Sequence, residues 1–112
     1  AGACIASNKC LRTANNFYTL QSPNLPDTPH KRSQLISAMM WEVAEVIGHD
    51  KTADTLYKAV DFLPRSCGYA DFIFGFMKAL QVLYNNESCS EILDIMKGRG
   101  FEEHINQRNI SC

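Results

Sequence analysis

Three helical stretches separated by two distinct breaks occupy residues 50–97, and this arrangement constrains the fold more than any other feature of the chain. The first break, residues 63–68, contains Pro64, which ends one helix, and Gly68, which comes just before the next. The second break, residues 85–88, is a polar turn that begins with two asparagines. Between the breaks, apolar side chains recur every three or four residues, which is the spacing of an amphipathic helix. The pattern predicts three consecutive short helices.

Two further helices are expected on the N-terminal side of this region. Residues 7–20 have the apolar spacing of an amphipathic helix. Residues 21–29 contain three of the four prolines and predict an extended loop. A second helix is then expected to begin at Pro29, a residue suited to the first helical position, and to run to about Ile47. Apolar residues cover more than half of its circumference, which predicts a central position.

The boundaries of the next helices are also marked by single residues. We expect Gly48 to end the second helix and Asp50 to cap the third, which spans roughly residues 51–63. A fourth helix is expected over roughly residues 69–85. The third helix presents one apolar set, formed by Ala53, Leu56, Tyr57, Val60, Phe62 and Leu63.

The fourth helix is the most apolar and is expected to hold the core. Its residues Phe72, Phe76 and Leu80 recur at i, i+4 and i+8, so all three are predicted to be buried. The fifth helix is expected to start with a capping box, in which Ser88 is the N-cap and Glu91 is the third helical residue. This box would satisfy two backbone N–H groups that have no partner inside the helix.

The whole chain, residues 1–112, is predicted to be a single all-α domain, a compact bundle of five or six short helices. No alternation of the strand period persists and no internal repeat is visible. Hydrophobic residues make up 46% and charged residues 21%, which is ordinary for a soluble globular protein. The length is sufficient to bury one modest core without a metal.

Charge and composition argue against several classes of function. The net charge of -1 does not favour binding to nucleic acid or to an anionic membrane. The chain contains no uninterrupted run of 18 apolar residues, so no transmembrane helix is predicted. The histidines and cysteines are too widely spaced for a zinc site, so no metal and no cofactor is expected. Cys67 precedes a helix and could act as a nucleophile, but no acid that would orient a base can be named. We therefore expect a non-enzymatic protein.

Five cysteines leave the redox state open. Because the count is odd, at least one thiol is free or bonded to another chain, and Cys4 and Cys112 are the best placed for a covalent dimer. Two N-glycosylation motifs, at Asn86 and Asn109, add to an extracellular interpretation. The candidates for a disulfide or a free thiol are Cys4, Cys10, Cys67, Cys89 and Cys112.

Charged side chains form two small faces. Lys9 and Arg12 share a side of the first helix, and Glu42 and Glu45 share a side of the second. Opposed basic and acidic faces on a small helical module permit head-to-tail association. The alternative is that both are ordinary solvated surfaces.

Residues 50–97 resemble the second half of a caspase-recruitment domain, a branch of the death-fold superfamily of six-helix bundles. The matching segments run from Ala53 to Leu56, from Val60 to Leu63, from Arg65 to Phe72, from Phe76 to Leu80 and from Ser90 to Leu93. They follow the order of that family, in which a helix ends in a leucine-rich turn, a glycine-containing loop follows, and an aromatic-anchored helix precedes a short capped one. The segment from Trp41 to Gly48 instead resembles the tryptophan-containing second helix of a death domain.

The resemblance implies a cytoplasmic interaction module that associates with its own kind through charged faces in apoptotic or innate immune signalling. The implied basic residues are Lys9, Arg12 and Lys78, and the implied acidic residues are Glu42, Glu45, Asp50 and Asp54.

A second hypothesis comes from a different class. The cysteines and the glycosylation motifs fit a secreted, disulfide-bonded helical protein that acts as a ligand, a coat component or a small-molecule carrier. Because the chain does not begin with Met, it is either a mature product without its leader or an excised piece.

Overall fold

The computed structural model describes residues 19, 21, 29–66 and 68–112, with the side chains of residues 29–33 left out. The expected first helix, the body of the proline-rich loop and five of the predicted site residues therefore lie outside the described residues. These five are Cys4, Lys9, Cys10, Arg12 and Cys67.

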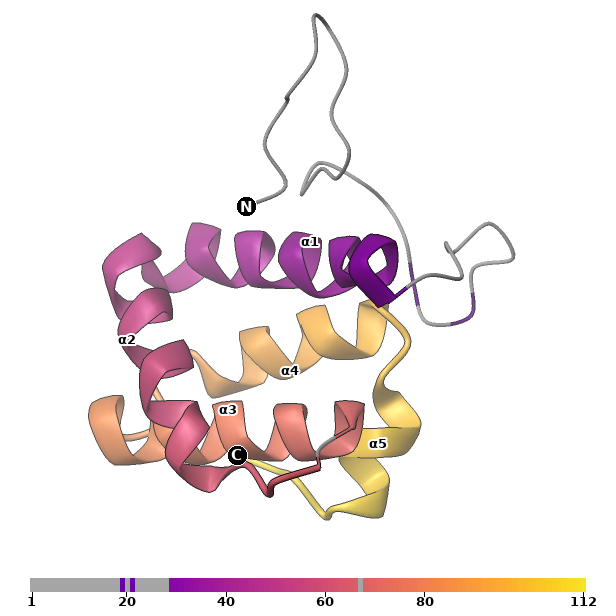
Figure 1. Cartoon of the computed structure of the whole chain (residues 1–112). Helices are drawn as coiled ribbons and strands as arrows, with labels where there is room; N and C mark the ends of the chain where they lie inside the picture. The colour runs from indigo at the N-terminus through magenta and orange to yellow at the C-terminus, as the bar shows by residue number, and fades with distance from the viewer. Residues whose placement is uncertain (1–18, 20, 22–28, 67) are drawn as a thin grey trace, which may run out of the picture.

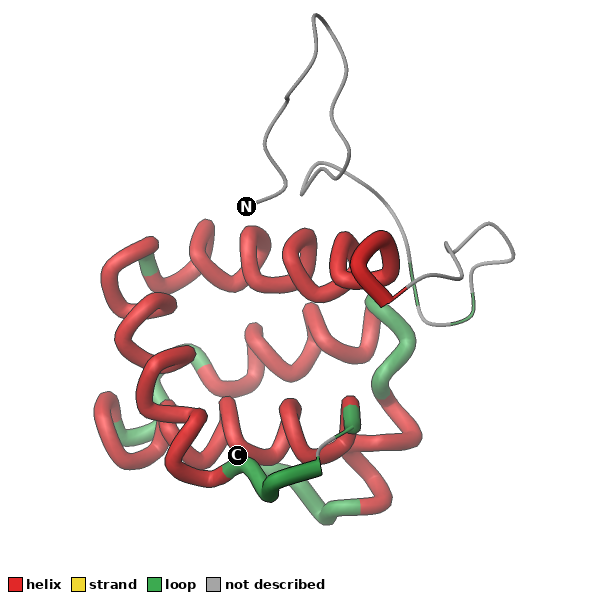
Figure 2. Tube along the Cα trace, in the orientation of Figure 1, coloured by secondary structure: helices red, strands yellow, loops and turns green. Residues whose placement is uncertain are grey.

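The described residues form an all-α bundle without strands, which confirms the predicted fold class (Figure 2). In the view of Figure 1, α1, α4 and α3 lie one below another, α2 runs down one side from α1 to α3, and α5 closes the opposite end. The elements are α1 (Pro29–Ile47), α2 (His49–Ala59), the 3-10 turn η1 (Val60–Phe62), α3 (Tyr69–Tyr84), α4 (Cys89–Gly98) and α5 (Glu102–Gln107).

The core lies between α1, α3, α4 and α5, with α3 contributing the most continuous buried stripe. Phe76 and Leu80 are fully buried, as predicted, whereas Phe72 is only partly buried against the core. Leu83, near the end of the same helix, is 40% exposed. Phe72 and Leu83 flank one side of the stripe, where no other helix covers them completely. The other fully buried large side chains are Leu35, Met39, Val43, Thr55, Ile73, Ile92, Met96 and Phe101.

The boundary between α1 and α2 differs from the prediction at one residue. Gly48 has a φ of 95°, and its N–H donates to Ala44 at 2.8 Å, so it ends α1 as expected. The same glycine is also the N-cap of α2, because its carbonyl accepts the first helical hydrogen bond, from the Thr52 N–H at 3.1 Å. Asp50 is therefore not the cap but the second residue of the helix. The glycine allows one helix to follow the other with no loop between them.

Helix α4 begins after Ser88, as predicted, but the predicted capping hydrogen bond from the Ser88 side chain is absent. Ser88 adopts a left-handed conformation, with a φ of 55°, and its side chain makes no capping hydrogen bond. Asn85 and Asn86, in the turn before it, also have positive φ angles, and Ser88 therefore lacks the extended conformation typical of an N-cap residue. The capping carboxylate is found at α3 instead, where Asp71 accepts a hydrogen bond from the Gly68 N–H at 3.0 Å.

The substitution Ser88→Ala is therefore expected to change the free energy of unfolding by less than about 0.5 kcal/mol, because no cap is lost. Ser88→Gly is expected to stabilise the protein slightly, since glycine adopts a positive φ without steric cost. Urea denaturation of unglycosylated protein measures both changes. A loss near 1 kcal/mol for Ser88→Ala would show that the capping box forms in solution.

A disulfide joins Cys89, at the start of α4, to Cys112 in the C-terminal tail, with an S–S distance of 2.03 Å and a Cα–Cα distance of 5.8 Å. Cys112 is thus bonded within its own chain, which corrects the expectation that it forms a covalent dimer. The same bond holds the tail against the helical bundle. Among the described residues, no helix has the length and apolar character to span a bilayer.

Candidate functional site

Helix α2 is inverted with respect to its own hydrophobic pattern. Its buried side consists of Thr52, Thr55 and Ala59, whereas Tyr57 is 86% exposed and Val60, just after the helix, is 62% exposed. The two threonine hydroxyls are buried at little cost because each donates to the backbone carbonyl four residues earlier, at 2.8 and 2.7 Å. Of the apolar set predicted for this helix, Ala53, Tyr57 and Val60 are therefore exposed to solvent, whereas Leu56, Phe62 and Leu63 are half-buried.

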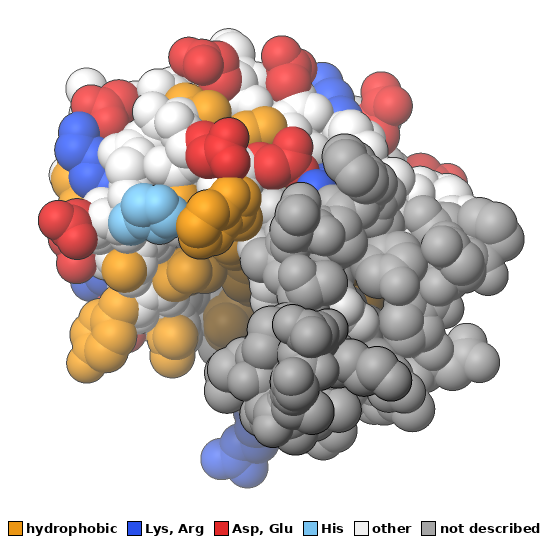
Figure 3. Space-filling view, turned by 90° about the horizontal axis from the view of Figure 1, so that it is seen from above, with side chains coloured by type: hydrophobic (Ala, Val, Ile, Leu, Met, Phe, Trp, Pro, Cys, Tyr) orange, Lys and Arg blue, Asp and Glu red, His pale blue; other side chains and the backbone are white. Residues whose placement is uncertain are grey.

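A hollow of about 250 Å³ lies between α1 and α2 and continues this exposed apolar stripe. Trp41, on the α1 side, is 52% exposed, and the edge of its ring meets the His49 ring with centroids 5.1 Å apart. Figure 3 shows hydrophobic side chains gathered beside a histidine on this part of the surface, with acidic side chains next to them. We call this surface the α1–α2 face, and define it by Trp41, His49, Ala53, Leu56, Tyr57 and Val60.

Carboxylates border the α1–α2 face on both helices. Glu45 follows Trp41 by one helical turn and is exposed. Asp54 and Asp61 lie three residues before and four residues after Tyr57, and exposed Asp50 lies one turn before Asp54. Lys58 offsets part of this charge through an ion pair of 3.0 Å with Asp61. The apolar surface is therefore bordered by several negatively charged side chains.

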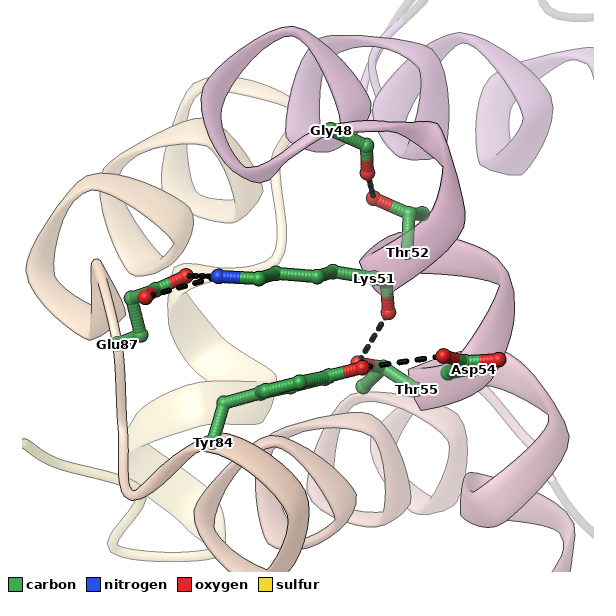
Figure 4. A network of polar contacts seen from close by, with 7 residues as sticks. All are labelled: Gly48, Lys51, Thr52, Asp54, Thr55, Tyr84 and Glu87. Atoms are coloured by element: carbon green, nitrogen blue, oxygen red, sulfur yellow. Dashed lines mark hydrogen bonds and ion pairs between the residues drawn. The ribbon is translucent and has the colours of Figure 1, made fainter.

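Polar contacts tie α2 to α3 and to the turn that follows α3 (Figure 4). Lys51 forms an ion pair of 2.7 Å with Glu87 in the α3–α4 turn. The Tyr84 hydroxyl donates to Asp54 at 3.1 Å. Partial burial, followed by this hydrogen bond to a carboxylate, raises the pKa of Tyr84 above its ordinary value. These contacts keep α2 in place while its apolar stripe remains exposed.

Close backbone packing supports the same arrangement. Gly75 of α3 lies under the end of α2, where an added Cβ would come within 3.2 Å of the Leu63 side chain and 3.3 Å of the Ala59 carbonyl. A larger residue at this position would push α2 and η1 away from α3. The glycine thus allows the end of α2 and η1 to pack closely against α3.

The predicted acidic residues do not all lie on one surface. Glu45 and Asp50 border the α1–α2 face, and Asp54 does so while accepting the hydrogen bond from Tyr84. Glu42 points to a different side of α1 and forms an ion pair of 2.5 Å with Arg99, whose side chain is only 10% exposed. Glu42 therefore joins α1 to the end of α4.

Of the predicted basic residues, Lys78 is the one within the described part of the chain. It lies at a second surface depression, of about 330 Å³, between α3 and the C-terminal tail. We call this depression the C-terminal hollow; the residues around it include Phe74, Met77, Lys78, Asn86, Arg108 and Asn109.

Arg108 is held in place at the C-terminal hollow by two contacts. Its guanidinium pairs with Asp71 and lies 5.5 Å from the centre of the Phe74 ring. The pKa of Asp71 is lowered, first by the hydrogen bond from the Gly68 backbone and then by Arg108. Arg108 is therefore already committed to contacts within the chain, whereas Lys78 is exposed and forms no ion pair with another described residue.

The exposed apolar face is the functional feature that the sequence analysis missed. A signal was present, because Thr52, Thr55 and Ala59 recur on one side of α2 and form a second stripe of small residues that can pack closely. Comparison with known proteins finds no matching family model, no matching curated sequence and no matching solved structure. The geometry of the face and the chemistry of its residues therefore carry the functional assignment.

Proposed function

We propose that this protein is a non-enzymatic interaction module that binds a partner protein through the α1–α2 face. The observation that carries the proposal is the inversion of α2, which buries threonines and leaves Tyr57 and Val60 in solvent. Exposing an apolar stripe costs free energy in an isolated molecule, and this cost is recovered when a partner covers the stripe. Tryptophan and tyrosine are also the residues most enriched at the energetic centres of interfaces.

The chemistry of the face indicates the chemistry of the partner. A groove between two helices with an apolar floor suits an amphipathic helix laid into it. The carboxylates Glu45, Asp50, Asp54 and Asp61 would attract lysine and arginine side chains that flank the apolar residues of that helix. We therefore propose a basic amphipathic helix of a partner protein as the occupant.

The disulfide supports a proposal for the compartment of the protein. A bond between Cys89 and Cys112 persists in an oxidising environment and is rare in the cytosol. We propose an extracellular location, which was the second hypothesis from the sequence. The cytoplasmic location, the death-fold relationship and the signalling role implied by the resemblance stay predictions, as does association between copies of this chain.

Trp41 provides a direct measurement of binding, because it is the single tryptophan of the chain and lies on the proposed face. Titration with a synthetic amphipathic helix of leucine and lysine should shift its fluorescence to shorter wavelength. A peptide of the same composition in scrambled order and a helix with glutamate in place of lysine should have no such effect at the same concentration. Binding should weaken as salt is raised.

Matched charge reversals test the acidic border. The double variant Glu45→Lys/Asp50→Lys is expected to weaken binding about tenfold, because each reversal replaces an exposed attraction of up to about 1 kcal/mol by a repulsion. Glu102→Lys/Glu103→Lys makes the same change of net charge on exposed residues of α5 and should leave binding unchanged. Equal weakening by both variants, or equal binding of all three peptides, would refute the proposal. A fluorescence shift that depends only on the protein's own concentration would identify a second copy as the occupant.

A further inference from the structure

Two glycosylation motifs that are far apart in the sequence meet at the C-terminal hollow. Asn86 lies in the turn between α3 and α4, and Asn109 follows α5 in the tail. Both asparagines border this hollow. The Cys89–Cys112 disulfide holds the two segments together, since each cysteine lies three residues after one of the asparagines.

Both asparagines are available for modification without loss of an internal contact. Neither side-chain amide forms a hydrogen bond with another described residue. Their φ angles, 64° for Asn86 and 54° for Asn109, lie in the left-handed region that asparagine tolerates better than most residues. Asn109 is exposed, whereas Asn86 is half-buried, so Asn109 is the more accessible of the two.

We propose that Asn109 carries an N-linked glycan that covers the C-terminal hollow. The inference rests on the extracellular location that we propose for the protein. Asn109 Nδ2 would attack C1 of the first sugar of a lipid-linked oligosaccharide pyrophosphate. The N–C1 bond forms, the C1–O bond to the pyrophosphate breaks, the lipid pyrophosphate leaves, and the amide nitrogen loses one proton. Ser111 supplies the hydroxyl that the motif requires two residues later.

The lining of the hollow suits a sugar attached at Asn109. Lys78 and Gln81 provide hydrogen-bond donors, while Phe74 and Met77 provide apolar surface for the less polar side of a sugar ring. None of the residues that define the α1–α2 face borders this hollow. The glycan would therefore cover one part of the surface and leave the proposed docking face accessible.

The test uses the full chain secreted from a eukaryotic cell line. Its intact mass should exceed the 12.6 kDa of the polypeptide and should fall after treatment with peptide N-glycosidase, which leaves an aspartate at the former site. Asn109→Gln and Ser111→Ala should each remove the glycan at this position. Asn106→Gln, an exposed asparagine of α5 outside any glycosylation motif, is the matched control and should leave the mass of the glycan unchanged.

Reactivity of Lys78 reports whether the glycan covers the hollow. Acetylation of Lys78 should be several-fold slower in the glycosylated protein than after the glycosidase, while exposed Lys97 of α4 should react equally in both. Absence of carbohydrate, carbohydrate on Asn86 alone, or a glycan on Asn109 that does not protect Lys78 would each overturn the proposal. Secretion without carbohydrate, combined with normal binding of the basic helix, would overturn this inference and leave the proposed function intact.

Discussion

Phe76→Ala is expected to lower the free energy of unfolding by about 3–5 kcal/mol, the largest effect of any single substitution considered for this protein. Phe76 is fully buried at the centre of the α3 stripe and is one of the largest buried side chains. Its removal forfeits the transfer free energy of the ring and leaves a cavity that the neighbouring helices cannot close. Urea denaturation with a common m-value measures the change.

Phe74→Ala is the matched control for Phe76→Ala. Phe74 lies on the same helix but is 37% exposed and contacts Arg108 at the surface. Its loss is expected to cost about 1 kcal/mol, because less apolar area is buried and water can fill the space. Equal costs for the two variants would show that the core is not centred on α3.

The double variant Cys89→Ser/Cys112→Ser is expected to lose about 3 kcal/mol of stability. The disulfide closes a loop with a sequence separation of 23 residues, and opening it restores conformational entropy to the unfolded chain. Thermal and urea unfolding under oxidising conditions should both report the loss. The extra freedom of the tail should also increase the proteolysis of the segment after α5.

A non-reducing peptide map is the control for this second prediction. A cross-linked peptide that contains Cys89 and Cys112 should be present in the wild-type monomer and absent from the double variant. Cys112 found in a disulfide-linked dimer instead, or a double variant as stable as the wild type, would contradict the intrachain bond.

The sequence by itself determined most of the helical layout. The boundaries of α3 agree with the expectation to within one residue, and α1 begins at the expected proline and ends before the expected glycine. These signals are readable because proline and glycine act on the backbone locally, independent of what packs against them. The burial of Phe76 and Leu80 was readable for a similar reason, since a long apolar stripe has to face the core.

The contacts of individual side chains were decided by the tertiary structure. The spacing around Ser88 predicted a cap, but Ser88 adopts a left-handed conformation and its side chain makes no capping hydrogen bond. Cys89 and Cys112 form one of the ten pairs that five cysteines allow, and the sequence left all of them open. Such features depend on where distant segments of the chain meet, which local spacing does not encode.

The orientation of α2 shows most clearly how tertiary packing can override a local sequence pattern. Its pattern defines two stripes, one apolar and one of Thr52, Thr55 and Ala59, and periodicity alone favours burial of the apolar one. The structure buries the small residues because α2 packs closely over Gly75. The threonine hydroxyls can be buried because each donates a hydrogen bond to a backbone carbonyl of the preceding turn. The sequence thus determined which residues share a side of the helix, whereas only the packing of α2 against α3 decided which side meets solvent and a partner.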